Sequence, residues 1–306
     1  MPKIETWQAS RYQTLFQKKA IRPGCEPKII DHGRKQNNVI VLIHGLTDSP
    51  YFMEAIGERF ALMGFNVLIP LLPGHGLKEP QGMKGVTLEE WQQEIDTTVE
   101  DAKELGDKVS IGGLSTGGTL SVWKAQKSPQ DINGGVFLFS AALDIAGKQG
   151  NFREKLLRTN FIRRLLAKLE DSNKPSLVGT DPDDNPYRYS RMDIDGAAQL
   201  SEAIKLVENA KLSQPLFVAH SEDDSAADIE GVEELIRNHP SKSAKTDFFR
   251  IGKNYHVPHA SVVLAEDVIS YNESPLEPKN PFFDLMINRI QRFLERFKYF
   301  DSLPEI

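Results

Sequence analysis

The stretch Ile111-Gly112-Gly113-Leu114-Ser115-Thr116-Gly117-Gly118 lies between a strand-like apolar segment and a segment of helical composition. Ser115 has a glycine two residues before it and another two residues after it, which is the spacing G-x-S-x-G. In this pattern a serine occupies a strained turn between a strand and a helix, and small neighbours make room for it. A glycine-rich turn without chemistry is the alternative. The strand-like residues 108–111 and the helix-compatible residues 119–126 favour a nucleophilic serine.

The start of the helix expected after Ser115 is suited to bind a negative charge. Its first N–H groups have no partner within the helix, and its dipole is positive at this end. Both features would stabilise an oxyanion that forms beside the serine hydroxyl.

The overall composition indicates a soluble globular protein that is long enough for one sizeable domain or two small ones. The chain has 306 residues, of which 40% are hydrophobic, and a formal net charge of −6. Nucleic-acid-binding proteins usually carry an excess of lysine and arginine, so we expect no nucleic-acid partner. Cys25 is the single cysteine, which excludes an intramolecular disulfide, and its place in a Pro/Gly-rich turn favours an inert thiol.

Features of membrane and secreted proteins are missing from the sequence. There is no run of roughly 18 apolar residues, and the first residues lack the charged-then-apolar pattern of a signal peptide. We therefore expect no stable membrane insertion, a cytoplasmic location, and a monomer or homodimer.

Strand-like and helix-like segments alternate up to residue 139. Strands are expected at 39–43, 65–69, 108–112 and 135–139, and helices at 52–63, 87–105 and 119–126. The run 39–43 is continuously apolar, which fits a strand buried on both faces. The alternation predicts a parallel α/β sheet with right-handed crossovers.

Two short regions near the N-terminus lie outside this alternation. Residues 1–25 are predicted to form an N-terminal arm, with an amphipathic helix over 5–20 that Pro23 and Gly24 end. Asn37 and Asn38 are predicted to form a turn before the first buried strand.

The alternation stops between Ala141 and Ser213, where we find no convincing strand. We interpret 141–213 as an insertion that sits on the sheet. Residues 152–169 predict a basic amphipathic helix. Packing of its apolar face on the body is favoured, and docking on a membrane surface or an anionic substrate is the alternative.

Two pairs of candidate catalytic residues follow the strands expected after this insertion. Asp223 and Asp224 follow the strand 215–219, and His256 and His259 follow the strand 246–251. Helices are expected at 228–238 and 281–297. A nucleophilic serine needs a histidine base and a carboxylate that orients the base, and the chain order Ser, Asp, His fits such a triad.

The sequence as a whole resembles α/β-hydrolases of the carboxylesterase and monoacylglycerol-lipase type over residues 38–297. The resemblance rests on His44-Gly45-Leu46-Thr47-Asp48-Ser49-Pro50, Pro73-Gly74-His75-Gly76, Gly113-Leu114-Ser115-Thr116-Gly117-Gly118 and the loops that hold Asp224 and His259. It implies an α/β-hydrolase fold, a mostly parallel sheet flanked by helices, in one domain over 1–306. It also implies that 141–213 is a helical cap, inserted between the strand after the nucleophile turn and the acid-bearing strand.

The resemblance also assigns roles to individual residues. It implies that Ser115 is the nucleophile and that the backbone N–H groups of Leu46 and Thr116 form the oxyanion hole. His44 and His75 lie in turn motifs of the family, so we expect them to shape the backbone with hydrogen bonds.

For the acid and the base, the resemblance favours one member of each pair. Asp224 is favoured over Asp223, because the family's G-x-x-D pattern fits if Ser221 replaces the glycine. His259 is favoured over His256, because the residues from 259 to 262 are more like the segment that follows the family's histidine.

The expected function is hydrolysis of a small-molecule carboxylic ester with a hydrophobic acyl group, through an acyl-enzyme and without a cofactor. No metal-ligand spacing occurs, so we expect no metal. A proline-type aminopeptidase, an amidase, a thioesterase or an acyltransferase is the alternative, because one fold hosts many chemistries. In a peptidase, Asp181, Asp183 and Asp184 could bind the substrate amine. A non-catalytic binding protein is a third hypothesis.

Overall fold

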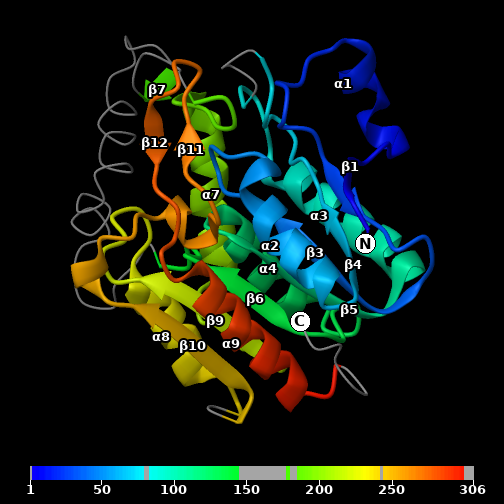
Figure 1. Ribbon diagram of the computed structural model, residues 1–306, viewed down its shortest axis with the longest axis vertical. Coiled ribbons are helices and arrows are strands. Elements are labelled where there is room, and N and C mark those ends of the chain that lie inside the picture. The colour runs from blue at the N-terminus through cyan, green and yellow to red at the C-terminus, as the bar shows by residue number, and fades with distance from the viewer. Residues whose placement is uncertain (1, 79–82, 145–176, 180–184, 242–243, 300–306) are drawn as a thin grey trace.

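An eight-stranded sheet with helices on both faces forms the centre of the protein (Figure 1). The computed structural model describes residues 2–78, 83–144, 177–179, 185–241 and 244–299. The strand order is β1-β2-β4-β3-β5-β6-β9-β10. Strand β2 is antiparallel to its neighbours β1 and β4, and the other pairs are parallel. The predicted α/β-hydrolase fold class is confirmed.

The parallel strands agree closely with the predicted ones. The sheet contains β1 Ile4–Thr6, β2 Lys28–Ile30, β3 Gln36–Ile43, β4 Phe65–Ile69, β5 Gly106–Leu114, β6 Val136–Phe139, β9 Leu216–Ser221 and β10 Thr246–Ile251. Residues 39–43 are completely buried, as expected for a strand that is covered on both faces.

Most of the predicted helices are also confirmed. They are α2 Tyr51–Leu62, α3 Leu88–Leu105, α4 Thr116–Lys127, α8 Ile229–Asn238 and α9 Phe283–Arg296. Helix α3 begins with a reciprocal cap, in which Thr87 Oγ1 accepts from the Glu90 N–H and the Glu90 carboxylate accepts from the Thr87 N–H.

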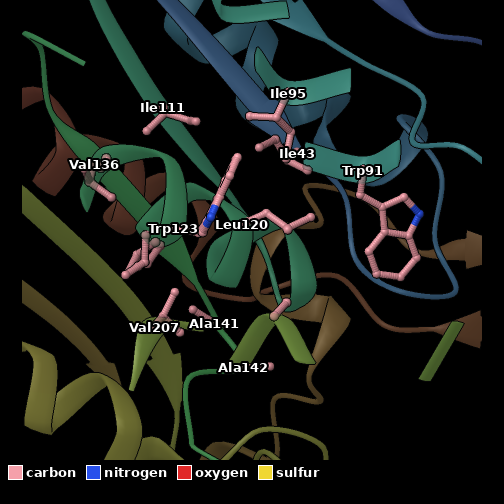
Figure 2. Close-up of a cluster of buried hydrophobic side chains, with 14 of the residues drawn as sticks. Ile43, Trp91, Ile95, Ile111, Leu120, Trp123, Val136, Ala141, Ala142 and Val207 are labelled. Carbon is pink, nitrogen blue, oxygen red and sulfur yellow. The ribbon is translucent and has the colours of Figure 1, made fainter. Parts of the chain in front are cut away.

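Two apolar cores cover the two faces of the sheet. Alternate residues of β3 enter different cores: Val41 and Ile43 face one, whereas Ile40 and Leu42 face the other. The first core includes residues of α3, α4, α8 and α7 (Ile194–Val207), and Figure 2 shows part of it around Trp91 and Leu120. The second includes residues of α2 and α9. The sheet is therefore a rigid support for the loops at its carboxyl edge.

The N-terminal arm differs from the prediction. Residues 5–20 do not form one helix: they contribute the end of β1, a short 3₁₀ turn at Ser10–Tyr12 and the single-turn helix α1, Gln13–Gln17. Pairing of β1 with β2 extends the sheet, which the periodicity did not reveal. The prediction of a turn at Asn37 and Asn38 was also wrong. Both residues lie in β3, where the buried Asn38 amide donates to the carbonyl of Tyr299.

The predicted absence of strands in 141–213 was wrong as well. Strands β7 (Leu177–Gly179) and β8 (Arg191–Asp193) form a separate antiparallel pair. Helix α7 follows β8 and packs against α3 and α4, so the end of the insertion adds to the body. The helix predicted at 152–169 lies outside the described residues.

One further hairpin stands at the same end of the sheet as β7. It consists of β11 (Val268–Ile269) and β12 (Pro275–Glu277), between His259 and α9 (Figure 1). Within the described ranges, no helix combines the length and the apolar character needed to cross a membrane.

Candidate active site

Ser115 occupies the predicted sharp turn between β5 and α4. Its backbone has φ +52° and ψ −114°, which is a strained conformation for a residue with a side chain. Its N–H donates to the Phe139 carbonyl at 3.1 Å, and its carbonyl accepts from the Ala142 N–H at 3.2 Å. A Cβ on Gly117 would collide with the Ile43 carbonyl, which explains one small residue of the motif. The predicted turn is confirmed, and the nucleophilic role stays a prediction.

The two predicted oxyanion donors come from separate elements. Thr116 is the first residue of α4, and Leu46 lies in the turn after β3. The turn is close to the serine, because a Cβ on Gly45 would lie 3.4 Å from Ser115 Cβ. Within the described part of the chain, neither the Leu46 N–H nor the Thr116 N–H donates a hydrogen bond. None of these residues prevents the two N–H groups from donating to a substrate oxygen.

Asp224 is held in the turn after β9 by a nearly complete set of hydrogen bonds. One carboxylate oxygen accepts from the N–H groups of Ala226 and Ala227 at 2.8 and 2.9 Å, and the other accepts from His259 Nδ1 at 2.7 Å. The side chain is only 1% exposed. Burial acts to raise its pKa, but His259, His220 and the backbone donor outweigh it and lower the pKa to about 2. Asp224 is therefore ionised at neutral pH.

His259 lies in the loop between β10 and the 3₁₀ turn Ala260–Val263. Burial acts to lower its pKa, but the charge and the hydrogen bond of Asp224 exceed this effect, and the net pKa is raised. Because Nδ1–H donates to Asp224, Nε2 is the nitrogen that can exchange a proton with a substrate or a serine. The arrangement suits a general base.

The second pair of candidates is also bonded. His256 Nδ1 lies 2.9 Å from a carboxylate oxygen of Asp223. The side chains of His256 and Asp223 are 78% and 31% exposed, against 15% and 1% for His259 and Asp224. Both candidate histidines are therefore bonded to a candidate aspartate, and the two pairs differ in how deeply they are buried.

The remaining histidines of the turn motifs are structural, as predicted. His44 Nδ1 donates to the Gly45 carbonyl at 2.9 Å, and its Nε2 accepts from the Leu72 N–H at 3.2 Å. His75 Nδ1 donates to the Pro73 carbonyl at 3.0 Å. Desolvation lowers the pKa of His44 to about 4 and that of His75 to about 3, so both rings are neutral.

A partly buried ion network beside the site was not anticipated from the sequence. Asp48 and Glu277 both pair with Arg188, at 3.2 and 2.8 Å. A Cβ on Gly45 would collide with the Asp48 carboxylate, and Asp48 also raises the pKa of His259. Asp48 thus lies close to both Ser115 and His259. An aspartate in the turn that follows the buried strand β3 was the available signal, but it does not identify the partner.

A cavity and an acidic cluster are formed by residues outside the predicted triad. The cavity, about 320 Å³, lies between α4, α7 and α8, with Val122, Leu143 and Asp144 in its wall. Oxygen atoms of Asp144, Asp228 and Glu230 come within 4.8 Å of one another. Asp228 caps α8 by accepting from the Glu230 N–H, and all three residues have further partners. These contacts give the cluster a structural explanation.

Comparison with known proteins agrees with this geometry. The family model described as serine aminopeptidase, S33 matches residues 34–257. A thermostable monoacylglycerol lipase from Bacillus sp. (strain H-257) is 32% identical over 122 residues, which are 40% of this chain and 46% of that protein. The aligned part is therefore less than half of the relative.

Solved structures extend the similarity over nearly the whole chain. A structure described under LipS and LipT, two metagenome-derived lipolytic enzymes, has a TM-score of 0.67 at 20% identity and covers 90% of this chain and 99% of its own. A soluble variant of monoglyceride lipase from Saccharomyces cerevisiae has a TM-score of 0.62 at 17% identity, with 99% and 96% covered. These similarities establish the fold. Since the family model covers most of the sequence, the chain belongs to the serine aminopeptidase S33 family of α/β-hydrolases.

Proposed function

We propose that this protein is a serine hydrolase that cleaves carboxylic esters with hydrophobic acyl groups. Ser115 is the nucleophile, His259 the base and Asp224 the acid, and the N–H groups of Leu46 and Thr116 form the oxyanion hole. The observation that supports this most strongly is the buried Asp224–His259 hydrogen bond at the same sheet edge as the strained Ser115 turn.

Acylation begins when His259 Nε2 removes the proton of the Ser115 hydroxyl while Oγ attacks the ester carbonyl carbon. The carbonyl oxygen becomes an oxyanion, and the N–H groups of Leu46 and Thr116 donate to it. The carbon–oxygen bond of the ester then breaks, and His259 gives its proton to the departing alcohol. Asp224 stabilises the imidazolium throughout, and the acyl group remains on Ser115.

Deacylation repeats these steps with water as the nucleophile. His259 removes a proton from the water molecule as its oxygen attacks the acyl-enzyme carbonyl. Collapse of the second oxyanion breaks the bond to Ser115, and the serine takes the proton back from His259. The carboxylic acid product leaves, and no cofactor is consumed.

The preference for a hydrophobic acyl group rests on the relatives and on the segment 141–213. The matched relatives and fold neighbours are named as lipases and lipolytic enzymes. We propose that 141–213 acts as a cap whose apolar residues cover the acyl chain. A monoacylglycerol belongs among the first substrates to assay.

Aminopeptidase activity is the second candidate, because the family model carries that description. A peptidase must bind the positive α-amine of its substrate, which needs an unpaired carboxylate. Asp48, in the turn beside Ser115, and Glu277 are both paired with Arg188. The acidic residues Asp181, Asp183 and Asp184 lie outside the described residues. The paired state of Asp48 and Glu277 favours the ester over the peptide.

The test compares Ser115→Ala with Ser128→Ala, a control at the far end of α4. We expect Ser115→Ala to lower turnover about a million-fold, because the other members of a triad cannot act without the nucleophile. Ser128→Ala should retain wild-type turnover, and both variants should keep the wild-type melting temperature. The assay uses p-nitrophenyl esters of short, medium and long acyl chains, a monoacylglycerol, and aminoacyl anilides.

Two results would count against the proposal. Wild-type turnover by Ser115→Ala would mean that Ser115 is not the nucleophile. Faster cleavage of aminoacyl anilides than of any acyl ester would favour the aminopeptidase.

A further inference from the structure

The turn that carries Leu46 is fixed mainly by a residue far away in sequence. The Asp48 N–H donates to the Gly45 carbonyl at 3.2 Å, so residues 45–48 form a tight turn. The Asp48 side chain is only 3% exposed. A buried carboxylate needs a partner of opposite charge or strong hydrogen-bond donors, and the partner here is Arg188.

Arg188 holds this turn through two adjacent residues. Its Nη2 donates to Thr47 Oγ1 at 2.8 Å, and its Nε lies 3.2 Å from the Asp48 carboxylate. The N–H of the next residue, Tyr189, donates to the Thr47 carbonyl at 2.8 Å. The segment around Arg188 therefore contacts the backbone of Thr47 and the side chains of Thr47 and Asp48.

Arg188 is itself fixed from two other parts of the chain. Its Nη1 donates to the Glu277 carboxylate in β12 at 2.8 Å. Its carbonyl accepts from the buried Arg22 side chain of the N-terminal arm at 3.1 Å, and Arg22 also donates to the Leu77 carbonyl. The guanidinium is planar and its donors are fixed in a fork. Because Arg188 is held at these two points, its donors also hold Thr47 and Asp48 in fixed positions.

We propose that Arg188 is a positioning residue, which holds the turn 45–48 so that the Leu46 N–H points at the developing oxyanion. This inference rests on the proposed ester hydrolysis. An N–H that is displaced by a fraction of an ångström would still admit substrate but would stabilise the transition state less. Loss of Arg188 should therefore lower kcat and leave KM nearly unchanged.

The network has a second, electrostatic consequence. Among the described residues, the charges of Asp224, Asp48 and Arg188 act on the pKa of His259, and His259 lowers that of His220. Asp48 raises the pKa of His259 and Arg188 lowers it. Removal of the Arg188 charge leaves the charge of Asp48 unbalanced, and the acid limb of kcat/KM should move to higher pH.

Two substitutions at this position separate the two effects. Arg188→Met removes both the charge and the fork, so we expect kcat to fall about 100-fold, as when one oxyanion donor is lost, with the acid limb at higher pH. Arg188→Lys keeps the charge but not the fork, so kcat should remain low while the acid limb stays at the wild-type pH. Arg289→Met, which removes a surface ion pair to Asp247, is the control and should match the wild type.

Active sites are counted by labelling with a fluorophosphonate to completion, so that misfolded protein does not lower the measured kcat. Thr47→Val is a milder variant that removes only the hydroxyl, which accepts from Arg188 at 2.8 Å and donates to Asp48 at 3.4 Å. It should fold, lower kcat about 10-fold per labelled site and leave the acid limb unmoved, as expected for one lost hydrogen bond to a charged group.

The proposal is overturned if Arg188→Met and Thr47→Val both turn over at the wild-type rate per labelled site. It is also overturned if kcat is kept and only KM rises, because Arg188 would then bind substrate and not orient the turn. A wild-type protein that fails to label at Ser115 would instead contradict the proposed function.

Discussion

Two aspartate–histidine pairs lie side by side at the carboxyl edge of the sheet, and they differ mainly in depth. Asp223 and His256 form a hydrogen bond of 2.9 Å, and Asp224 and His259 form one of 2.7 Å. Each pair joins the loop after β9 to the loop after β10. The outer histidine is 78% exposed, whereas the inner one is 15% exposed.

This difference shows why an Asp–His contact alone does not define a catalytic dyad. Water competes for the exposed pair and screens its charges, so Asp223 holds the His256 ring less firmly in one orientation. In the inner pair, two backbone N–H groups hold the Asp224 carboxylate, and the pKa values of both partners are shifted. A fixed and ionised carboxylate can orient the base.

Removal of each histidine should give the largest contrast. His259→Ala should lower ester turnover about a million-fold, because the serine then lacks its base. His256→Ala should change turnover less than about 3-fold, because its ring is exposed and screened. Steady-state assays of both variants on one p-nitrophenyl ester measure the contrast. Equal losses would mean that both rings take part in proton transfer.

The two aspartates should differ by a smaller factor. Asp224→Asn keeps the shape of the side chain but favours the wrong histidine tautomer, so we expect kcat to fall about 10,000-fold. Asp223→Asn should remain near wild-type activity. A larger loss in Asp223→Asn than in Asp224→Asn would reverse our assignment of the acid.

The smallest expected effect is a shift in pH dependence. His259 acts as a base only when neutral, and its pKa is raised above the ordinary value of 6.5. Activity should therefore rise with pH through a midpoint above 6.5, and Asp224→Asn should move the midpoint of its residual activity to lower pH. The midpoint of His256→Ala should equal that of the wild type. A wild-type midpoint below 6.5 would contradict the raised pKa.

The sequence was sufficient for the central part of the fold because local pattern and tertiary environment agree there. Residues 39–43 are all apolar, whereas 65–69 and 246–251 are mostly apolar or β-branched, and each run lies in a parallel strand. The helix predicted at 87–105 begins with a purely local cap between Thr87 and Glu90. Such signals need no knowledge of distant residues.

The parts that were missed depend on partners far away in the chain. Strand β1 exists because it pairs with β2, and β7 because it pairs with β8, which three-residue segments do not reveal. The family resemblance favoured His259 over His256, but the difference in their depth, 15% against 78% exposed, was not visible in the sequence. Arg188 reaches Asp48 across 140 residues, so only the folded chain identifies the pair.

The most direct test of the account is the rate at which a fluorophosphonate labels Ser115, with the modified peptide identified by mass spectrometry. We expect the wild type and His256→Ala to label at Ser115 at the same rate, and His259→Ala to label far more slowly. Unchanged labelling of His259→Ala, or modification of a residue other than Ser115, would contradict the account.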